Sequence, residues 1–297
     1  MTLMQKAVTP QLSEAYLAAG FERTGGFAVP AQTVTWASTA ADLVRAHGLT
    51  YPGSPYGPDS PHVDVLRFEA TAQLRFEDAV GGPDRRTRER TGGPFLDRPP
   101  FTGTGFVGLD DHVVPLYWFV HSRVPAGAQL VRVGADGSSV LLATYVDVAH
   151  GWVTEDRAVA FGLLPLHVGP LARWNGNVHP ADVLGDRVVL AAAEPLDGFE
   201  RTAAGRFRRD VPRGDVEELF ELYVEARWNG LDVRVVDEFT DRGRHLVRVC
   251  ATTHDADLAE GLRMDKVEAA LYEATVAPGS LTDVVTSQLV PAGWATR

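Results

Sequence analysis

The pentapeptide Ala-Arg-Trp-Asn-Gly occurs twice in the second half of the chain, at residues 172–176 and again at 226–230. Each copy is followed by apolar, β-branched runs and then by a segment, 207–219 or 272–284, in which five positions match without a gap. The matching positions are an aromatic residue, a valine, a glycine and two aliphatic residues. An aromatic-x-x-x-Val run places alternate residues inward and predicts a strand. The Pro or Gly after it predicts a turn or a short capped helix.

The same strand-and-turn unit is echoed near the N-terminus. Residues 20–24 and 198–202 both read Gly-Phe-Glu-Arg-Thr, and a Val-Pro pair with a later valine follows at 29–34 and 211–216. Chance alone can supply one such match, whereas a five-letter identity beside a separate gapless pattern favours duplication. We therefore predict a small hairpin module that ends in a turn and is used more than once.

Short helices and strands are predicted in the first half from periodicity and stop signals. The segments predicted as helices, each stopped by a glycine, are 11–19 and 39–47. The segments predicted as loops, rich in Pro, Gly or polar residues, are 51–61 and 81–105. Alternating or β-branched runs predict strands at 63–76, 113–120, 128–133 and 139–148. The Asp136-Gly137 pair between the last two is a hairpin signal, so this region is predicted as an antiparallel meander.

These patterns predict an α+β fold of antiparallel sheets with a few short helices, in two halves that contain related repeat units. The N-terminal domain is expected over residues 1–155 and includes the meander. The C-terminal domain is expected over residues 156–297 and is built from two repeat units.

The charge of the chain narrows the choice of partner. Its net charge is −11, and residues 210–297 alone carry 17 acidic against 9 basic residues, which gives −8. A segment this acidic argues against nucleic acid or an anionic membrane as its partner, and favours either a basic protein partner or solubility alone. The chain has one cysteine, no apolar run of about 18 residues and no signal-peptide pattern, so a cytoplasmic location is expected.

The C-terminal part resembles a known family. The strand-like run 231–239, the segment 250–262 with Asp255-Ala-Asp257, the Lys266-Val267 step and the segment 271–283 look like the tail of actinobacterial proteins encoded beside secreted toxins. Those proteins are regarded as immunity or accessory factors, and the toxins include NAD-degrading ones similar to tuberculosis necrotizing toxin. The resemblance covers about 70 residues and leaves the first half unexplained. The chain departs from the family pattern at Ala269-Ala270, where a glycine turn is usual.

Catalytic motifs are not found in the sequence. There is no nucleophile elbow, phosphate-binding loop, dinucleotide fingerprint or zinc-protease motif, and no His lies four residues from another His. We therefore expect no metal and no cofactor. Asp110-Asp111-His112 suits a solvated turn better than a metal site. Cys250 is expected to be a buried, inert thiol, and Asp255 is expected to cap a helix that begins at Ala256.

The predicted function is a non-catalytic binding protein that neutralises a toxin, as the resemblance implies, through an acidic surface that meets a basic partner. Glu217, Glu221 and Glu225 are predicted to share one helix face, with Glu218 beside them. Trp294 near the C-terminus is expected in a groove or an interface. The paired Trp174 and Trp228 are expected in the core or packed on hairpins.

The alternative is an enzyme in the N-terminal half that acts on a nucleotide-like ligand by NAD glycohydrolase or ADP-ribosyl chemistry. In this interpretation Arg85, Arg86 and Arg88 hold a phosphate together with Arg123. Arg123 ends a predicted strand, where ADP-ribosyltransferases place an arginine that binds NAD. Those enzymes also need a catalytic Glu after a Ser-containing strand, and no matching Glu is evident, so a surface arginine is the plainer interpretation.

Overall fold

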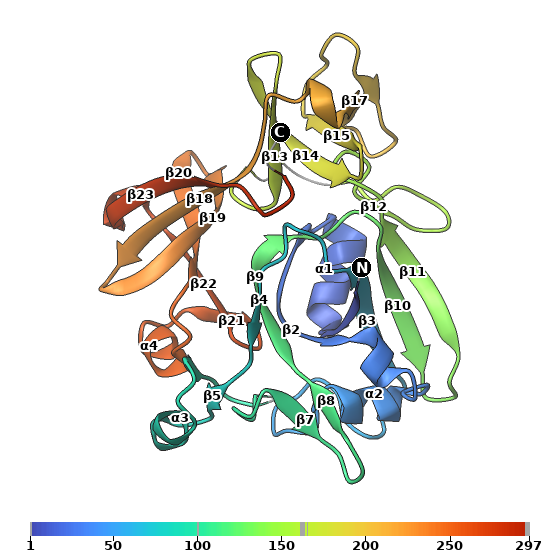
Figure 1. Cartoon of the computed structure of the whole chain (residues 1–297), viewed down its shortest axis with the longest axis vertical. Coiled ribbons are helices and arrows are strands. Elements are labelled where there is room, and N and C mark those ends of the chain that lie inside the picture. Colours follow the sequence, from blue (N-terminus) through green and yellow to red (C-terminus); the bar gives the residue numbers. More distant parts are fainter. Residues whose placement is uncertain (1, 100, 161–163, 165, 295–297) are drawn as a thin grey trace.

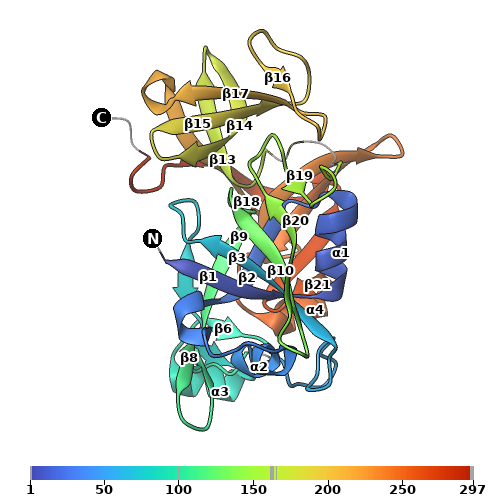
Figure 2. The same ribbon diagram turned by 90° about the vertical axis from the view of Figure 1, so that its right-hand side faces the viewer.

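The computed structural model describes residues 2–99, 101–160, 164 and 166–294. The fold is α+β and consists mainly of two large antiparallel sheets, one from each half of the chain. Figures 1 and 2 show the first sheet in the body of the molecule, with the second half of the chain at one end and along one side. None of the helices in the described part of the chain is long and apolar enough to cross a bilayer.

The first sheet is antiparallel throughout, in the order β12-β11-β10-β3-β1-β2-β9-β4. Its strands are β1 (Leu3–Val8), β2 (Arg23–Pro30), β3 (His62–Glu69), β4 (Phe76–Asp78), β9 (Tyr117–Arg123), β10 (Ala128–Gly134), β11 (Ser139–Tyr145) and β12 (Trp152–Val153). Two small sheets flank it, formed by β5 (Gly81–Gly82) with β6 (Phe95–Leu96), and by β7 (Phe106–Gly108) with β8 (Val113–Pro115).

Four short α-helices occur among the described residues: α1 (Pro10–Ala19), α2 (Ala40–Ala46), α3 (Arg85–Thr91) and α4 (Ala256–Gly261). Three of these helices were predicted from local signals in the sequence. Gly20 ends α1 in the left-handed conformation, Thr39 caps α2 in a capping box, and Asp255 caps α4 as predicted. The buried Tyr16 of α1 packs into the core of the first sheet, and α2 covers another part of the same sheet.

Three predictions for the first half are wrong in part. The segment 63–76 is two strands, because a turn closed by Leu74 N–H on the Thr71 carbonyl at 3.1 Å separates β3 from β4. The loop predicted over 81–105 contains helix α3, capped by Asp84 and ended by left-handed Gly92. The meander is limited to β10, β11 and β12, since β9 pairs with β2 and β4 instead.

The second sheet runs β16-β17-β15-β14-β13-β18-β19-β20-β22-β21, with β23 paired to β18. Its strands are β13 (Pro170–Trp174), β14 (Asn177–Leu184), β15 (Arg187–Ala192), β16 (Glu200–Arg201), β17 (Phe207–Pro212), β18 (Glu218–Trp228), β19 (Leu231–Asp241), β20 (Arg244–Ala251), β21 (Asp265–Glu268), β22 (Leu271–Val276) and β23 (Thr282–Leu289).

The pairing order within this sheet occurs twice. In the first unit β13, β14, β15 and β17 pair in succession and β18 returns to β13. In the second unit β18, β19, β20 and β22 do the same and β23 returns to β18. A short 3-10 turn precedes each returning strand, over Arg213–Asp215 and Pro278–Ser280. Common origin by duplication is not confirmed by this recurrence and stays a prediction.

The repeated Trp-Asn-Gly letters have a local explanation. They form the two-residue turns of the β13–β14 and β18–β19 hairpins, with Asn175 and Asn229 at φ 49° and 50° and the glycines after them also at positive φ. Turns that need positive φ at both central positions favour Asn-Gly. Trp174 and Trp228, just before these turns, pack against the apolar cores of their respective units, as predicted.

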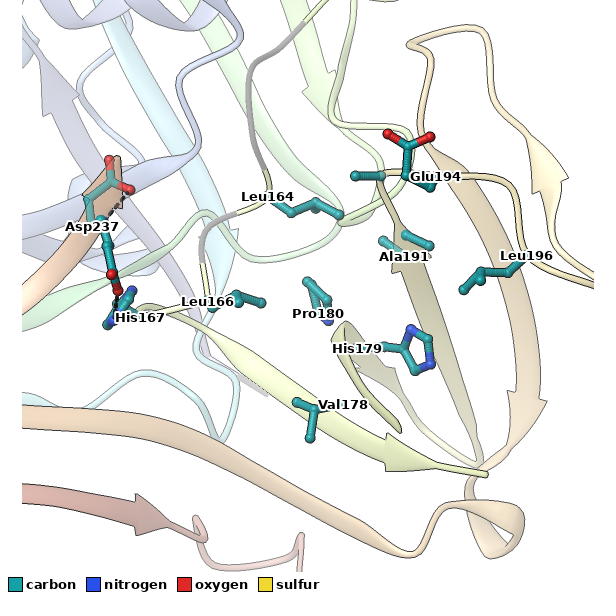
Figure 3. Close-up of a pocket in the computed structure, with 13 residues that line it drawn as sticks. Leu164, Leu166, His167, Val178, His179, Pro180, Ala191, Glu194, Leu196 and Asp237 are labelled. Carbon is teal, nitrogen blue, oxygen red and sulfur yellow. Dashed lines mark hydrogen bonds and ion pairs between the residues drawn. The ribbon is translucent and has the colours of Figure 1, made fainter. Parts of the chain in front are cut away.

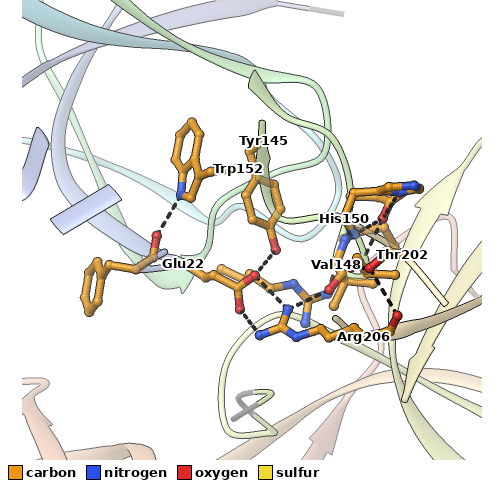
Figure 4. A network of polar contacts seen from close by, with 12 residues as sticks. Glu22, Tyr145, Val148, His150, Trp152, Thr202 and Arg206 are labelled. Carbon is orange, nitrogen blue, oxygen red and sulfur yellow. Dashed lines mark hydrogen bonds and ion pairs between the residues drawn. The ribbon is translucent and has the colours of Figure 1, made fainter. Parts of the chain in front are cut away.

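Buried ion pairs join the two halves of the chain. Figure 4 shows Arg206 bound to both oxygens of Glu22, at 2.8 and 2.9 Å, while the Tyr145 hydroxyl donates to the same carboxylate at 3.0 Å. Both charged side chains are 4% exposed. Paired charges this deeply buried fix the position of the β16–β17 region against the start of β2.

Candidate partner-binding groove

The four glutamates predicted to form an acidic helix face do not form one. They lie on or just before β18, because Leu219, Phe220, Leu222 and the residues after them favour a strand. Glu221 is buried and accepts a hydrogen bond from Gly169 N–H at 3.0 Å. Glu217 accepts from Gly176 N–H at 3.0 Å, and Glu218 pairs with Arg173 at 2.9 Å. Glu217, Glu218 and Glu225 are exposed, but the first two already have partners, so Glu225 is the exposed carboxylate of the four with no contact described above.

Trp294 was predicted in a groove or an interface and is in fact a core residue. It is 5% exposed and belongs to the apolar cluster of the first unit, with Val188, Leu190 and Leu219. The chain returns after β23 to cover this unit, which brings the last described residue back to its core.

The arginines proposed for a phosphate site do not converge. Arg85 and Arg88 on α3 face helix α4, at 3.6 Å from Asp257 and 2.9 Å from Asp255 respectively, whereas Arg86 lies on the same helix with its side chain exposed. Arg123 is fully buried, where it donates to the Ala181 carbonyl and pairs with Asp182 at 3.2 Å. It is therefore neither a surface residue nor one that an external nucleotide can reach.

A groove of about 540 Å³ lies where the first unit meets the β19 strand. Its lining residues are Leu164, Leu166, His167, Val178, His179, Pro180, Ala191, Ala192, Ala193, Glu194, Leu196, Asp237 and Glu238. We call this hollow the acidic groove. Figure 3 shows His167 and Asp237 on one side of it and Glu194 and Leu196 on the other.

Small side chains on two neighbouring strands explain why the surface is hollow here. Val178 and Pro180 are two residues apart on β14 and so point to one face of the sheet. Ala191 near the end of β15 and Ala193 just after it, also two residues apart, add little volume beside them, while Ala181 and Val188 are buried in the unit's core. The result is an apolar floor that no larger side chain of these strands fills.

The floor carries apolar side chains that remain open to solvent. Leu166, Leu196 and Val178 are 45%, 44% and 42% exposed. Scattered exposed aliphatic residues are ordinary, but a contiguous group around one hollow with a polar rim is typical of an interaction site. The groove therefore has the composition of a binding surface.

The rim is acidic. It contains three carboxylates, Glu194, Asp237 and Glu238, and no Lys or Arg occurs among the residues that line it. Burial lowers the pKa of His167, against the opposing effect of Glu238, and burial likewise lowers the pKa of His179. Both rings are neutral at pH 7, so the histidines add no positive charge to the rim.

The rim carboxylates differ in how far they are engaged. Asp237 accepts from Arg23 at 2.7 Å, and Glu238 lies 2.6 Å from the exposed His245. Within the part of the chain that the structure describes, Glu194 has neither a hydrogen-bond nor an ion-pair partner and is exposed. Glu194 and Glu238 are thus the carboxylates that an incoming cation meets first.

Sequence reasoning missed this groove because its parts are far apart in the chain. The signal in the sequence was weak: the alanine run 191–193 ends a strand and is followed directly by Glu194. Nothing in that run indicated that Leu166, His167 and residues near 237 would line the same groove. Comparisons with protein-family models, with curated proteins and with solved structures found no match.

Other candidate residues behave as follows. Cys250 is buried as predicted, and burial first, then the nearby Glu273 charge, raises the pKa of its thiol to about 12, so it is protonated and unreactive at neutral pH. His112 contacts Asp111 at 2.6 Å on the surface. In the described ranges, no three His, Cys, Asp or Glu side chains gather closely enough to hold a metal ion.

Proposed function

We propose that this protein is a non-catalytic binding protein, and that the acidic groove accepts an apolar segment of a basic protein partner. The observation that carries the proposal is the combination of exposed Leu166, Val178 and Leu196 with a rim of carboxylates and no cation. Apolar side chains give such an interface its affinity, and complementary charge gives it association rate and selectivity. The acidic contact is thus assigned to the groove rather than to the β18 glutamates.

The class of partner follows from the resemblance of the C-terminal part to factors encoded beside secreted toxins. On that basis the partner is a toxin, and the protein acts as its immunity or accessory factor. The groove supports this proposal in one respect: its chemistry fits a basic, partly apolar segment. The alternative of a nucleotide-processing enzyme loses three of the four arginines on which it rested, since Arg123 is buried and Arg85 and Arg88 face α4.

The experiment uses random-peptide phage display on the full chain, followed by titration of the selected peptides. We expect enrichment of peptides with aliphatic residues flanked by Arg or Lys. The double variant Glu194→Lys/Glu238→Lys should weaken their binding by at least about tenfold. The matched control is Glu217→Lys/Glu225→Lys, which reverses the same number of charges on the β18 side and should leave binding unchanged.

Two results would overturn the proposal. One is selection of peptides without basic residues, and the other is loss of binding only in the β18 control variant. The toxin assignment is tested separately, by co-expressing the protein with the toxin encoded nearest to its gene. Rescue of growth by the wild type, and its loss in the groove variant, is the expected result. Absence of rescue refutes the toxin assignment without refuting the groove.

A further inference from the structure

A second cavity, of about 350 Å³, lies between the two halves of the chain. Its lining residues are Thr9, Gln11, Leu12, Ala15, Phe21, Arg23, Thr24, Gly25, His121, Arg248, Val267, Glu268, Leu271 and Glu273. They come from α1, β2 and β9 of the first half and from β20, β21 and β22 of the second. We call this hollow the inner cavity. Its volume falls at the lower end of the range of about 300–1,000 Å³ that is usual for small-molecule sites.

The Gly25-Gly26 pair lets the strand β2 pass close to the walls of this cavity. A Cβ on Gly25 would lie 3.1 Å from Leu271 Cδ1 and 3.2 Å from His121 Cα, and Gly26 has φ +86°. Larger residues would push β2 away from β9 and from the β21–β22 hairpin. Two adjacent glycines therefore bring groups from both halves around one space.

One end of the inner cavity is a cluster of buried charged and polar side chains. The carboxylate of Glu273 lies 3.2 Å from His121 Nε2, 3.4 Å from Arg248 Nη1 and 3.6 Å from Arg23 Nη2. These separations exceed the 2.7–2.9 Å of well-formed charge-assisted hydrogen bonds. The cluster is held together by charge, and its hydrogen-bonding capacity is not used up.

Several donors in this cluster lack hydrogen-bond partners. Among the described residues, Nε of Arg23, Nε of Arg248 and both ring nitrogens of His121 are buried and make no hydrogen bond. Arg23 is 7% exposed and His121 is 5% exposed. Buried polar atoms are nearly always bonded, so four such atoms around one cavity are typical of a binding site.

The unused groups are mainly donors. Each Arg Nε can only donate, and a neutral His donates from one nitrogen and accepts at the other. His121 is neutral because burial, reinforced by the charges of Arg23 and Arg234, lowers its pKa well below the ordinary value. A ligand that satisfies this end of the cavity must therefore supply hydrogen-bond acceptors.

Much of the remaining wall is apolar, and Thr9, Gln11, Thr24 and Glu268 also line it. Leu12 and Ala15 contribute from α1, Phe21 from the start of β2, and Val267 and Leu271 from the β21–β22 hairpin. Fixed charges near the cavity balance, with Lys6 paired to Glu268 and Arg23 paired to Asp237.

We infer that the inner cavity binds a small, mainly apolar molecule through a carbonyl or carboxylate oxygen that accepts hydrogen bonds from Arg23 and Arg248. The apolar body lies along Leu12 and Leu271. Because Arg248 is a third exposed, its side chain stands at the entrance, whereas Arg23 closes the inner end. This site is separate from the acidic groove, so it stands or falls independently of the proposed function.

Three probes with one apolar body test this inference: phenylacetate, phenylacetamide and phenethylamine, titrated into the full chain with protein-observed NMR. We expect the acid, the amide or both to shift resonances of α1 and β22. The amine, whose head is a donor, should bind at least about tenfold more weakly. Binding of the acid alone identifies a carboxylate head, and binding of the amide alone identifies a carbonyl head.

Two variants locate the site. Arg248→Gln removes a donor from the entrance and should weaken binding by about tenfold or more, and Ala15→Leu should block the cavity from the α1 side. Arg244→Gln is the matched control, because this exposed arginine is on the same strand, β20. The inference is overturned by preferential binding of the amine, by no binding of any probe, or by binding that both variants leave unchanged.

Discussion

Arg23 Nη1 donates to Asp237 Oδ2 across 2.7 Å, and the two side chains line different hollows. Arg23 belongs to the inner cavity, whereas Asp237 lies on the rim of the acidic groove. A ligand that draws Arg23 inward therefore weakens its hold on a rim carboxylate. By linkage we also expect that occupation of the groove changes the affinity of the cavity.

Asp237→Asn tests this connection. It removes the charge of the Arg23 partner, and we expect the free energy of unfolding to fall by about 1–3 kcal/mol, because a largely buried arginine loses its strongest acceptor. Phenylacetate should bind more tightly to this variant, since one competing anion is gone. Urea unfolding and NMR titration measure the two effects. Asp241→Asn, on the exposed end of the same strand, should change neither.

The Glu22–Arg206 pair should be one of the most sensitive points of the interface between the halves. Glu22→Gln removes the charge of the carboxylate that binds the buried Arg206 guanidinium through two hydrogen bonds, and we expect a loss of about 3–5 kcal/mol in the free energy of unfolding. Arg187→Gln breaks the exposed pair with Asp210 and should cost less than about 1 kcal/mol. Equal losses in the two variants would contradict a structural role for the buried pair.

Stability should fall as the pH drops from 6.5 towards 3, partly because of His47. Burial, and to a smaller extent the charge of Lys6, lowers the pKa of His47 from 6.5 to about 3. In this window the unfolded chain takes up a proton that the folded chain does not. The stabilisation is therefore complete above pH 6.5 and is lost below it, by about 1.4 kcal/mol per pH unit.

His47→Gln checks the sign of this effect. Between pH 6.5 and 4, we expect the free energy of unfolding of the variant to depend less steeply on pH than that of the wild type. Asp182 acts in the opposite direction between pH 3.8 and 6, because burial raises its pKa to about 6 despite the Arg123 charge. The difference between variant and wild type, rather than the wild-type curve alone, isolates His47. Parallel curves would show that His47 is not neutral in the folded state.

Asn229 should tolerate glycine but not valine. It adopts φ 50° in the β18–β19 turn, where a side chain without β-branching and with a polar group is favoured. Asn229→Val should reduce the free energy of unfolding by about 1–2 kcal/mol, and Asn229→Gly should leave it nearly unchanged. Thermal unfolding of both variants beside the wild type provides the comparison.

Local signals in the sequence predicted local structure well. Gly20 and Thr39 mark the ends of helices, Asp136-Gly137 marks a hairpin, and Asp255 caps α4, because each acts through its own backbone. Helix α3 was missed because its caps, Asp84 and Gly92, enclose an arginine-rich run with no apolar spacing. A helix held by caps and ion pairs carries no periodic signal.

Predictions from the sequence failed where the environment of a residue depends on distant parts of the chain. The spacing of Glu217, Glu221 and Glu225 fits a helix face. The aromatic and aliphatic residues between them instead form a strand, β18, which pairs with β13 and with β19. His121 and Glu273 are far apart in the sequence and meet only because the halves pack together. Neither the acidic groove nor the inner cavity could be predicted from a motif, since no short segment supplies more than a few of the residues that line it.

Strand β18 belongs to both units of the second half: its first residues pair with β13, and its later residues pair with β19 and β23. A cut or a proline near Leu222 would therefore open two cores at once. Under tension or partial denaturation, we expect that the two units do not unfold independently, one after the other. We therefore expect the second half of the chain to unfold as one cooperative unit.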